Sequence, residues 1–112
     1  MALRKEIGKI KSIAFGWGGY QDAMIGVSVD LGSDKDSWGV GDFRGAWGTK
    51  VDKYTKWTDE ERLIELGKTC MWVKGLLSDA KVQTLDKLKG TPVEVTFEGN
   101  TLKSWRILTE VI

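Results

Sequence analysis

The chain has 112 residues, a length that fits one domain with a modest core. Its 17 basic and 16 acidic residues leave a net charge of +1, which argues against a protein that coats DNA through many phosphate contacts. No apolar run approaches the roughly 18 residues of a membrane span, and the N-terminus lacks the apolar region of a signal peptide. One cysteine, Cys70, leaves no partner for an intrachain disulfide. We therefore expect a single domain over residues 1–112, located in the cytoplasm of the producing cell.

The first part of the chain predicts three strands. Residues 5–15 carry apolar side chains at uneven spacing, which indicates a strand with a bulge or a helical turn. Residues 23–31 alternate cleanly, and the glycine-rich segment 16–22 indicates a hairpin connection between these two strands. After a turn at 32–34, residues 37–43 form the third expected strand.

A helix is expected from about residue 59 to residue 78. Thr58 and Glu61 form a capping box, in which the Thr58 hydroxyl accepts a hydrogen bond from the Glu61 amide. Gly67 and Gly75 interrupt this helix at a cost of about 1 kcal/mol each relative to alanine, and we expect them to mark close packing against a sheet. Apolar side chains at spacings of three and four predict one buried stripe, formed by Leu63, Leu66, Cys70, Val73 and Leu77.

A hairpin is expected at the C-terminus, with Gly99-Asn100 as its two-residue turn. With an unbroken register, Arg106 lies opposite Val93 on the apolar face, and Trp105 lies on the other face. Either a bulge exchanges these faces, or both faces are covered, for example by a second subunit.

The order of strands, helix and strands predicts a small α+β domain with a mainly antiparallel sheet. The sequence contains no histidine, which removes Ser-His-Asp and Cys-His nucleophile systems and the commonest general base. A single cysteine cannot build a cysteine-zinc site, and the glycine-rich segments complete no phosphate-loop motif. We expect a binding protein without metal or cofactor. An enzyme that processes a nucleotide with carboxylates alone stays an alternative.

Aromatic residues and glycines are concentrated between residues 15 and 57. This stretch holds four of the six Trp, both Tyr and nine of the 14 Gly. Tryptophan supplies a large flat contact area and glycine permits close approach, so the pattern is typical of a surface that binds a planar group. Residues 44–57 add four basic side chains against one acidic side chain, a local charge of +3. Such a mixture favours a nucleotide or a short single strand, because bases stack on rings and phosphates meet cations.

Six residues are the candidate ligand contacts: Trp17, Tyr20, Arg44, Trp47, Trp57 and Arg106. The aromatic rings are expected to stack on a base, and the two arginines are expected to hold phosphates. Arg106 is the best single phosphate-binding candidate, because an arginine among apolar side chains needs an anion. Structural alternatives stay open. The rings can instead anchor the segment 44–57 and close the end of the sheet, and Arg106 can pair with an internal carboxylate such as Glu94 or Glu110.

Three segments of the chain resemble a family of small proteins encoded by bacteriophages and prophages. They are Gly19-Tyr20-Gln21-Asp22-Ala23 with Gly26, Trp38-Gly39-Val40-Gly41-Asp42-Phe43, and residues 92–100 with Ser104-Trp105-Arg106. The element order is also similar to that of phage sponges of the anti-Thoeris type, which are homo-oligomers that sequester cyclic ADP-ribose signals and sometimes cyclic oligonucleotides. These resemblances imply a homo-oligomeric counter-defence protein in the host bacterial cytoplasm, which binds a small nucleotide signal and withholds it from a host defence effector.

Two other functions stay open on the sequence alone. An inhibitor of a host defence nuclease, of the anti-CRISPR kind, would use the aromatic patch as a protein-binding hot spot. A single-stranded nucleic-acid binder would use the same rings for stacking, and its affinity would fall steeply with salt.

Overall fold

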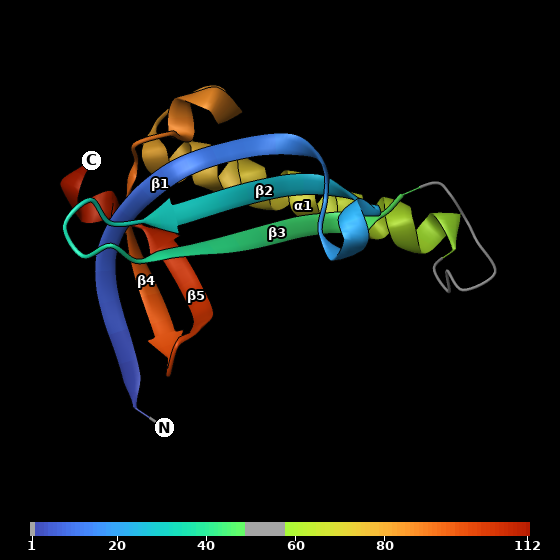
Figure 1. Ribbon diagram of the computed structural model, residues 1–112. Coiled ribbons are helices and arrows are strands. Elements are labelled where there is room, and N and C mark those ends of the chain that lie inside the picture. The colour runs from blue at the N-terminus through green and yellow to red at the C-terminus, as the bar shows by residue number, and fades with distance from the viewer. Residues whose placement is uncertain (1, 49–57) are drawn as a thin grey trace.

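The computed structural model describes residues 2–48 and 58–112 (Figure 1). These residues form five strands, one α-helix and three short 3-10 helices. The strands are β1 (Leu3–Gly18), β2 (Met24–Gly32), β3 (Gly39–Trp47), β4 (Pro92–Glu98) and β5 (Thr101–Ile107), the helix is α1 (Asp59–Ala80), and the 3-10 helices are η1 (Tyr20–Asp22), η2 (Leu85–Leu88) and η3 (Thr109–Val111). The predicted α+β class is confirmed, with N-terminal strands, a central helix and a C-terminal hairpin.

The five strands form one antiparallel sheet in the order β3-β2-β1-β4-β5. The long strand β1 joins two halves of this sheet, because its residues 3–9 pair with β4 and its residues 9–18 pair with β2. A bulge at Lys11, the extra residue between Ile10 and Ser12, interrupts the register with β2. Figure 1 shows β1 bending between the halves, so that β4 and β5 run steeply across the direction of β2 and β3.

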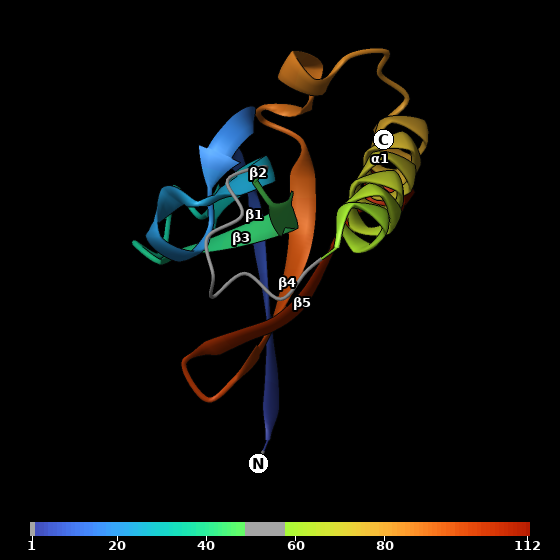
Figure 2. The same ribbon diagram turned by 90° about the vertical axis from the view of Figure 1, so that its right-hand side faces the viewer.

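The core lies on the face of the sheet that α1 covers, which we call the core face; the opposite side is the outer face. Figure 2 shows α1 standing beside β1 to β4. The largest fully buried side chains come from β1, β2, η2 and β4, and they are Ile10, Val27, Val29, Leu31, Leu88, Val93 and Val95. Removal of these apolar groups from water is the main stabilising contribution to the fold. No helix in the described ranges has the length and apolar character needed to cross a bilayer.

The helix begins as predicted but buries a different face. Thr58 caps it, and its hydroxyl accepts a hydrogen bond from the Glu61 amide at 3.1 Å. The buried side chains of α1 are Arg62, Thr69, Leu76 and Ala80. The predicted stripe is wrong at Leu63 and Cys70, which are exposed. Apolar side chains are spread around most of this helix, so a spacing of three and four fits more than one stripe.

The two helical glycines do not pack against the sheet, and that prediction is wrong as well. A Cβ added to Gly67 or to Gly75 would meet nothing within 4 Å. Both positions lie on the exposed side of α1. Their presence therefore has no explanation in the packing of the described chain.

The C-terminal hairpin contains a bulge, which was one of the two alternatives that the sequence left open. Lys103 is an extra residue that shifts the pairing of β5 with β4. The shift brings Trp105 opposite Val95, on the core face, and places Arg106 opposite Glu94, on the outer face. The prediction that Arg106 lies among apolar side chains, which assumed an unbroken register, is therefore wrong. One inserted residue exchanges the two faces of a strand.

Candidate ligand site

Trp17 lies at the end of β1 and is 62% exposed. The ring edge that carries Cζ3 rests on Gly48, where a Cβ would lie only 2.3 Å from that atom. The Gly48 amide donates a hydrogen bond to the Ala23 carbonyl at 2.9 Å, which fixes this backbone. Trp17 is thus held in place along one edge while most of its surface is open to solvent, as a ring that stacks on a ligand requires.

Tyr20 and Trp47 meet next to the same turn. Their ring centroids are 6.1 Å apart and the rings make an edge-to-face contact at 78°. Tyr20 is 67% exposed, and the two residues that follow it, Gln21 and Asp22, have φ of 52° and 54°. A left-handed backbone costs a residue other than glycine on the order of 1 kcal/mol. The surrounding structure therefore maintains a strained turn that presents Tyr20 to solvent.

Phe15 is an exposed aromatic residue that the sequence reasoning did not include in the site. It precedes Trp17 by two residues, so both rings project from the same face of β1. Phe15 lies opposite Val27 of β2 and is 60% exposed. The signal in the sequence was the alternation of Ile13, Phe15 and Trp17, which places three apolar side chains on one face at a period of two.

A hollow of about 340 Å³ lies between β3 and α1 at this end of the molecule. Its lining combines apolar, glycine and charged residues, namely Met24, Phe43, Arg44, Gly45, Glu65, Lys68 and Thr69. The volume is at the lower end of the range of small-molecule pockets. Two cations against one carboxylate give the hollow a net positive charge. Met24 pairs with Trp47 across β2 and β3, so the hollow adjoins Trp47 and, through its ring contact, Tyr20.

Arg44 connects this hollow to an aromatic cluster between the sheet and α1. Its guanidinium carbon lies 4.6 Å from the centroid of Trp72, and its Nε lies 3.8 Å from Oδ2 of Asp42. The same carboxylate oxygen accepts a hydrogen bond from Nε1 of Trp105 at 2.8 Å. The Arg44 side chain is 52% exposed, and its two terminal nitrogens donate to no described residue. Stacking therefore orients the guanidinium while its terminal donors stay available to an anion.

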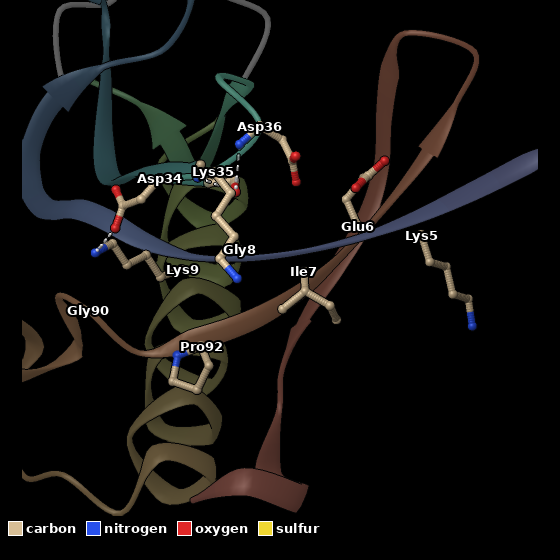
Figure 3. A pocket seen from close by; sticks show the side chains of 12 residues that line it. Lys5, Glu6, Ile7, Gly8, Lys9, Asp34, Lys35, Asp36, Gly90 and Pro92 are labelled. Atoms are coloured by element: carbon tan, nitrogen blue, oxygen red, sulfur yellow. Dashed lines mark hydrogen bonds and ion pairs between the residues drawn. The ribbon is translucent and has the colours of Figure 1, made fainter.

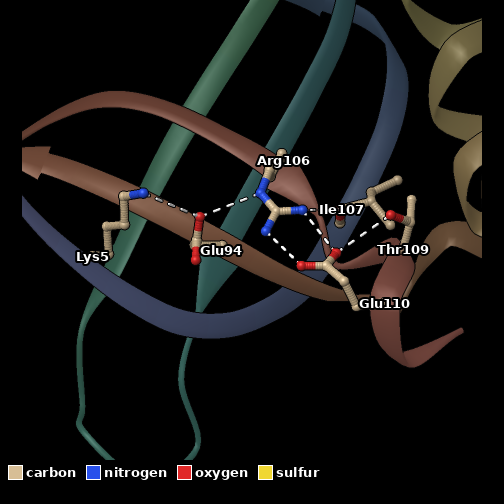
Figure 4. Close-up of polar contacts among 6 residues, drawn as sticks. All are labelled: Lys5, Glu94, Arg106, Ile107, Thr109 and Glu110. Carbon is tan, nitrogen blue, oxygen red and sulfur yellow. Dashed lines mark hydrogen bonds and ion pairs between the residues drawn. The ribbon is translucent and has the colours of Figure 1, made fainter.

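Arg106 lies in the other half of the sheet and its donors are occupied (Figure 4). Its Nη1 and Nη2 donate to Glu110 at 2.9 and 2.7 Å, and its Nε donates to Glu94 at 3.3 Å. Hydrogen bonds from Arg106 lower the pKa of Glu110 from 4.5 to about 2, and the same bonds raise the pKa of Arg106. The alternative that Arg106 pairs with the internal carboxylates Glu94 and Glu110 is therefore confirmed. The structure does not bring Arg106 to the exposed rings.

A larger hollow, of about 590 Å³, lies beside the turn at 33–36 (Figure 3). Acidic and basic side chains alternate along it, and no aromatic ring lines it. Asp34 forms ion pairs with both Lys11 and Lys9, and hydrogen bonds from these lysines lower the pKa of Asp34 from 3.8 to about 2. No cluster of potential metal ligands occurs among the described residues. The acidic turn therefore serves to fasten the 33–36 segment onto β1.

The structure places Trp17, Tyr20, Arg44 and Trp47 at one end of the β1-β2-β3 half of the sheet. It separates Arg106 from them, and Trp57 lies outside the described residues. No family model matches this chain, and no curated protein or solved structure matches it either. The function is therefore argued from the site.

Proposed function

We propose that this chain is a non-enzymatic, homo-oligomeric phage counter-defence protein that binds a small nucleotide signal and withholds it from a host defence effector. It acts in the host bacterial cytoplasm, and its ligand is a cyclic ADP-ribose-like compound or a cyclic oligonucleotide. The observation that supports this proposal is the gathering of exposed rings and incompletely paired cations at one end of β1, β2 and β3.

The aromatic side chains supply the affinity for the base. Trp17 is held along one edge by Gly48, and Tyr20 packs edge-to-face against Trp47, so both rings are restrained before a ligand arrives. Stacking of a base on an aromatic ring contributes about 1–3 kcal/mol. Rings that are held in place before binding retain more of this gain, because less side-chain entropy is lost.

The cations of the hollow supply the affinity for phosphate. Arg44 is oriented by Trp72, and Lys68 lies across the hollow on α1, where it forms an exposed ion pair with Glu65 at 3.1 Å. The carboxylate of Glu65 limits the local charge to +1. This small excess suits a ligand with one or two phosphates better than a triphosphate, whose charge would be left largely unmatched.

Withholding a signal requires affinity and no chemical step. That requirement fits a chain without histidine, since the commonest general base is absent from its whole sequence. It also fits a site built from rings and cations, which recognise a nucleotide without activating a nucleophile.

Lys68 provides a direct test with a matched control. Lys68→Ala removes a cation of the hollow, whereas Lys103→Ala removes an exposed cation of the C-terminal hairpin, which pairs with Glu98 at 3.7 Å. In titrations with cyclic ADP-ribose and with cyclic dinucleotides, followed by tryptophan fluorescence, Lys68→Ala should weaken binding about tenfold, as expected for one charge-assisted hydrogen bond. Lys103→Ala should change it less than twofold. Equal effects of the two substitutions on affinity would show that the hollow does not contribute to ligand binding.

A second candidate function, binding of a short single strand, is favoured by one specific observation. Phe15 and Trp17 project from the same face of β1, about 7 Å apart along the strand, as successive rings of a base-stacking platform do. An oligonucleotide that binds this way loses affinity steeply between 50 and 200 mM salt. A small cyclic ligand with one or two phosphates shows a much weaker salt dependence. If no nucleotide of either kind binds, the remaining candidate is that the exposed rings bind a protein target, such as a host defence nuclease.

A further inference from the structure

The exposed face of α1 carries a row in which large and small residues alternate. Leu63, Gly67, Met71 and Gly75 are spaced four residues apart, so they form one continuous ridge along the helix. Leu63 is 70% exposed and Met71 is 64% exposed, although both are large and apolar. The ridge lies on the side of α1 that the sheet leaves uncovered, and Figure 2 shows strands β1 to β4 beside the helix.

The two glycines of this row have no function in the packing of the described chain. A glycine in a helix interior costs about 1 kcal/mol relative to alanine. A Cβ at Gly67 or Gly75 would meet nothing within 4 Å, so alanine would fit at either position in the single chain. Two such costs on one exposed face are explained if another molecule approaches the helix backbone there.

The row is complementary to itself when it is reversed. In one direction it reads large, small, large, small, and in the other direction it reads small, large, small, large. Two helices that cross in antiparallel orientation midway between Gly67 and Met71 therefore place Met71 of each copy over Gly67 of the second copy, and Leu63 over Gly75. We infer that α1 forms the interface of a dimer of this chain with two-fold symmetry, in which each large side chain fills the space above a glycine.

Charge supports a second copy as the occupant of this face. The antiparallel crossing sets the acidic first turn of one helix, with Glu60 and Glu61, beside the C-terminal turns of the other helix. Those turns carry Lys74 and Asp79, and Lys81 follows at the C-cap, so their net charge is +1. Glu60, Glu61 and Lys74 are exposed, and neither Glu60 nor Lys74 has an ion pair among the described residues. Each copy therefore offers both the acidic and the basic partner, as an interface with two-fold symmetry requires.

The strength of the dimer follows from the length of the helix. A helix of 22 residues is about 33 Å long, and a contact along one ridge buries less area than the roughly 1,600 Å² of a standard interface. We expect a dimer that dissociates on dilution. The inference does not depend on the nucleotide, because the ridge faces away from the sheet that carries the exposed rings.

Exchange of two side chains within the row tests this interface. Gly67→Met sets two methionines against each other in the dimer but enters open space in the single chain. The double variant Gly67→Met/Met71→Gly keeps the composition of the helix and restores a large residue opposite a small one. Circular dichroism checks that each variant keeps its helix, and sedimentation velocity over a concentration series measures the dissociation constant.

The natural protein should sediment as a dimer at high concentration and as a monomer on dilution. Gly67→Met should raise the dissociation constant at least tenfold, and the double variant should return it to within about threefold of the natural value. A natural protein that is monomeric at every concentration would overturn the inference. So would an unchanged dissociation constant for Gly67→Met, or a folded double variant that stays monomeric. Nucleotide binding by a monomeric variant separates a failure of this interface from a failure of the proposed function.

Discussion

The two halves of the sheet share strand β1 but differ in the kind of side chain that they leave available to a ligand. In the β1-β4-β5 half, exposed cations already have carboxylate partners, and Arg106 is paired with both Glu94 and Glu110. In the β1-β2-β3 half, large rings such as Trp17 and Tyr20 stay exposed. A group whose donors are satisfied inside the chain gains little from a ligand, whereas an exposed ring or an unfilled donor gains more. The comparison is therefore the reason for proposing that the ligand site lies in the second half.

The largest expected effect tests how the aromatic half is built. Gly16, Gly26 and Gly45 form a row across β1, β2 and β3. A Cβ at Gly45 would lie 2.1 Å from the Ile25 carbonyl oxygen, whereas a Cβ at Gly16 would meet nothing within 4 Å. Gly45→Ala should lower the free energy of unfolding by about 3 kcal/mol in urea titrations, because backbone must move.

The matched control for that prediction is Gly16→Ala in the same row. It should leave the free energy of unfolding unchanged or raise it by about 0.5 kcal/mol, since glycine is the more flexible residue in the unfolded chain. Equal losses for the two variants would contradict the close approach of β2 and β3.

The next prediction concerns the contact that joins the two halves. Trp105→Phe keeps an aromatic ring on β5 but removes the hydrogen bond from Nε1 to Asp42. The free energy of unfolding should fall by about 1–2 kcal/mol, because the part-buried carboxylate loses a donor. Trp72→Phe, which removes no hydrogen bond to a described residue, is the control and should cost less. A loss at Trp72 as large as that at Trp105 would indicate that ring packing alone joins the halves.

Tyr20→Ala tests, through nucleotide affinity, whether the exposed rings of the β1-β2-β3 half form the ligand site. It should weaken affinity for a bound nucleotide about tenfold, through the loss of one stacked ring, and change stability by less than about 0.5 kcal/mol. Ile7→Ala, at an apolar residue that is 57% exposed in the other half, should leave the affinity unchanged. The measurement is a fluorescence titration of both variants with the same ligand. An unchanged affinity for Tyr20→Ala would exclude this ring from the site.

The smallest expected effect lies in the ion-paired half. The folded pKa of Glu110 is lowered from 4.5 to about 2, so its pair with Arg106 stabilises the fold above pH 4.5 and loses this contribution as the pH falls toward 2. Glu110→Gln should therefore lower the urea midpoint slightly at pH 7, and the difference from the natural protein should vanish near pH 2. A difference that persists at pH 2 would show that charge is not its cause.

The sequence predicted the elements well, because local signals specify them. The alternation before Leu31, the cap at Thr58 and the Gly99-Asn100 turn each correspond to an element in the structure. The bulge at Lys103 could only be offered as an alternative, because an inserted residue leaves no local signature and is decided by which face of the hairpin meets the core.

The candidate site was predictable in part. Aromatic and glycine content pointed to the end of the sheet where Trp17 and Tyr20 lie. The ion pairs of Arg106 and the position of Lys68 opposite Arg44 depend on strand register and on the rotation of α1. Both are long-range properties, which spacing along the chain does not determine.

The most direct test of the proposed function is native mass spectrometry of the purified protein. The protein is measured alone and after incubation with a mixture of cyclic dinucleotides, cyclic trinucleotides and cyclic ADP-ribose compounds. The account predicts an added mass on a discrete oligomer, released as the unaltered compound on denaturation, and absent from the double variant Tyr20→Ala/Lys68→Ala. A chemically altered compound would identify an enzyme, and the absence of any adduct over the whole mixture would contradict sequestration of a nucleotide signal.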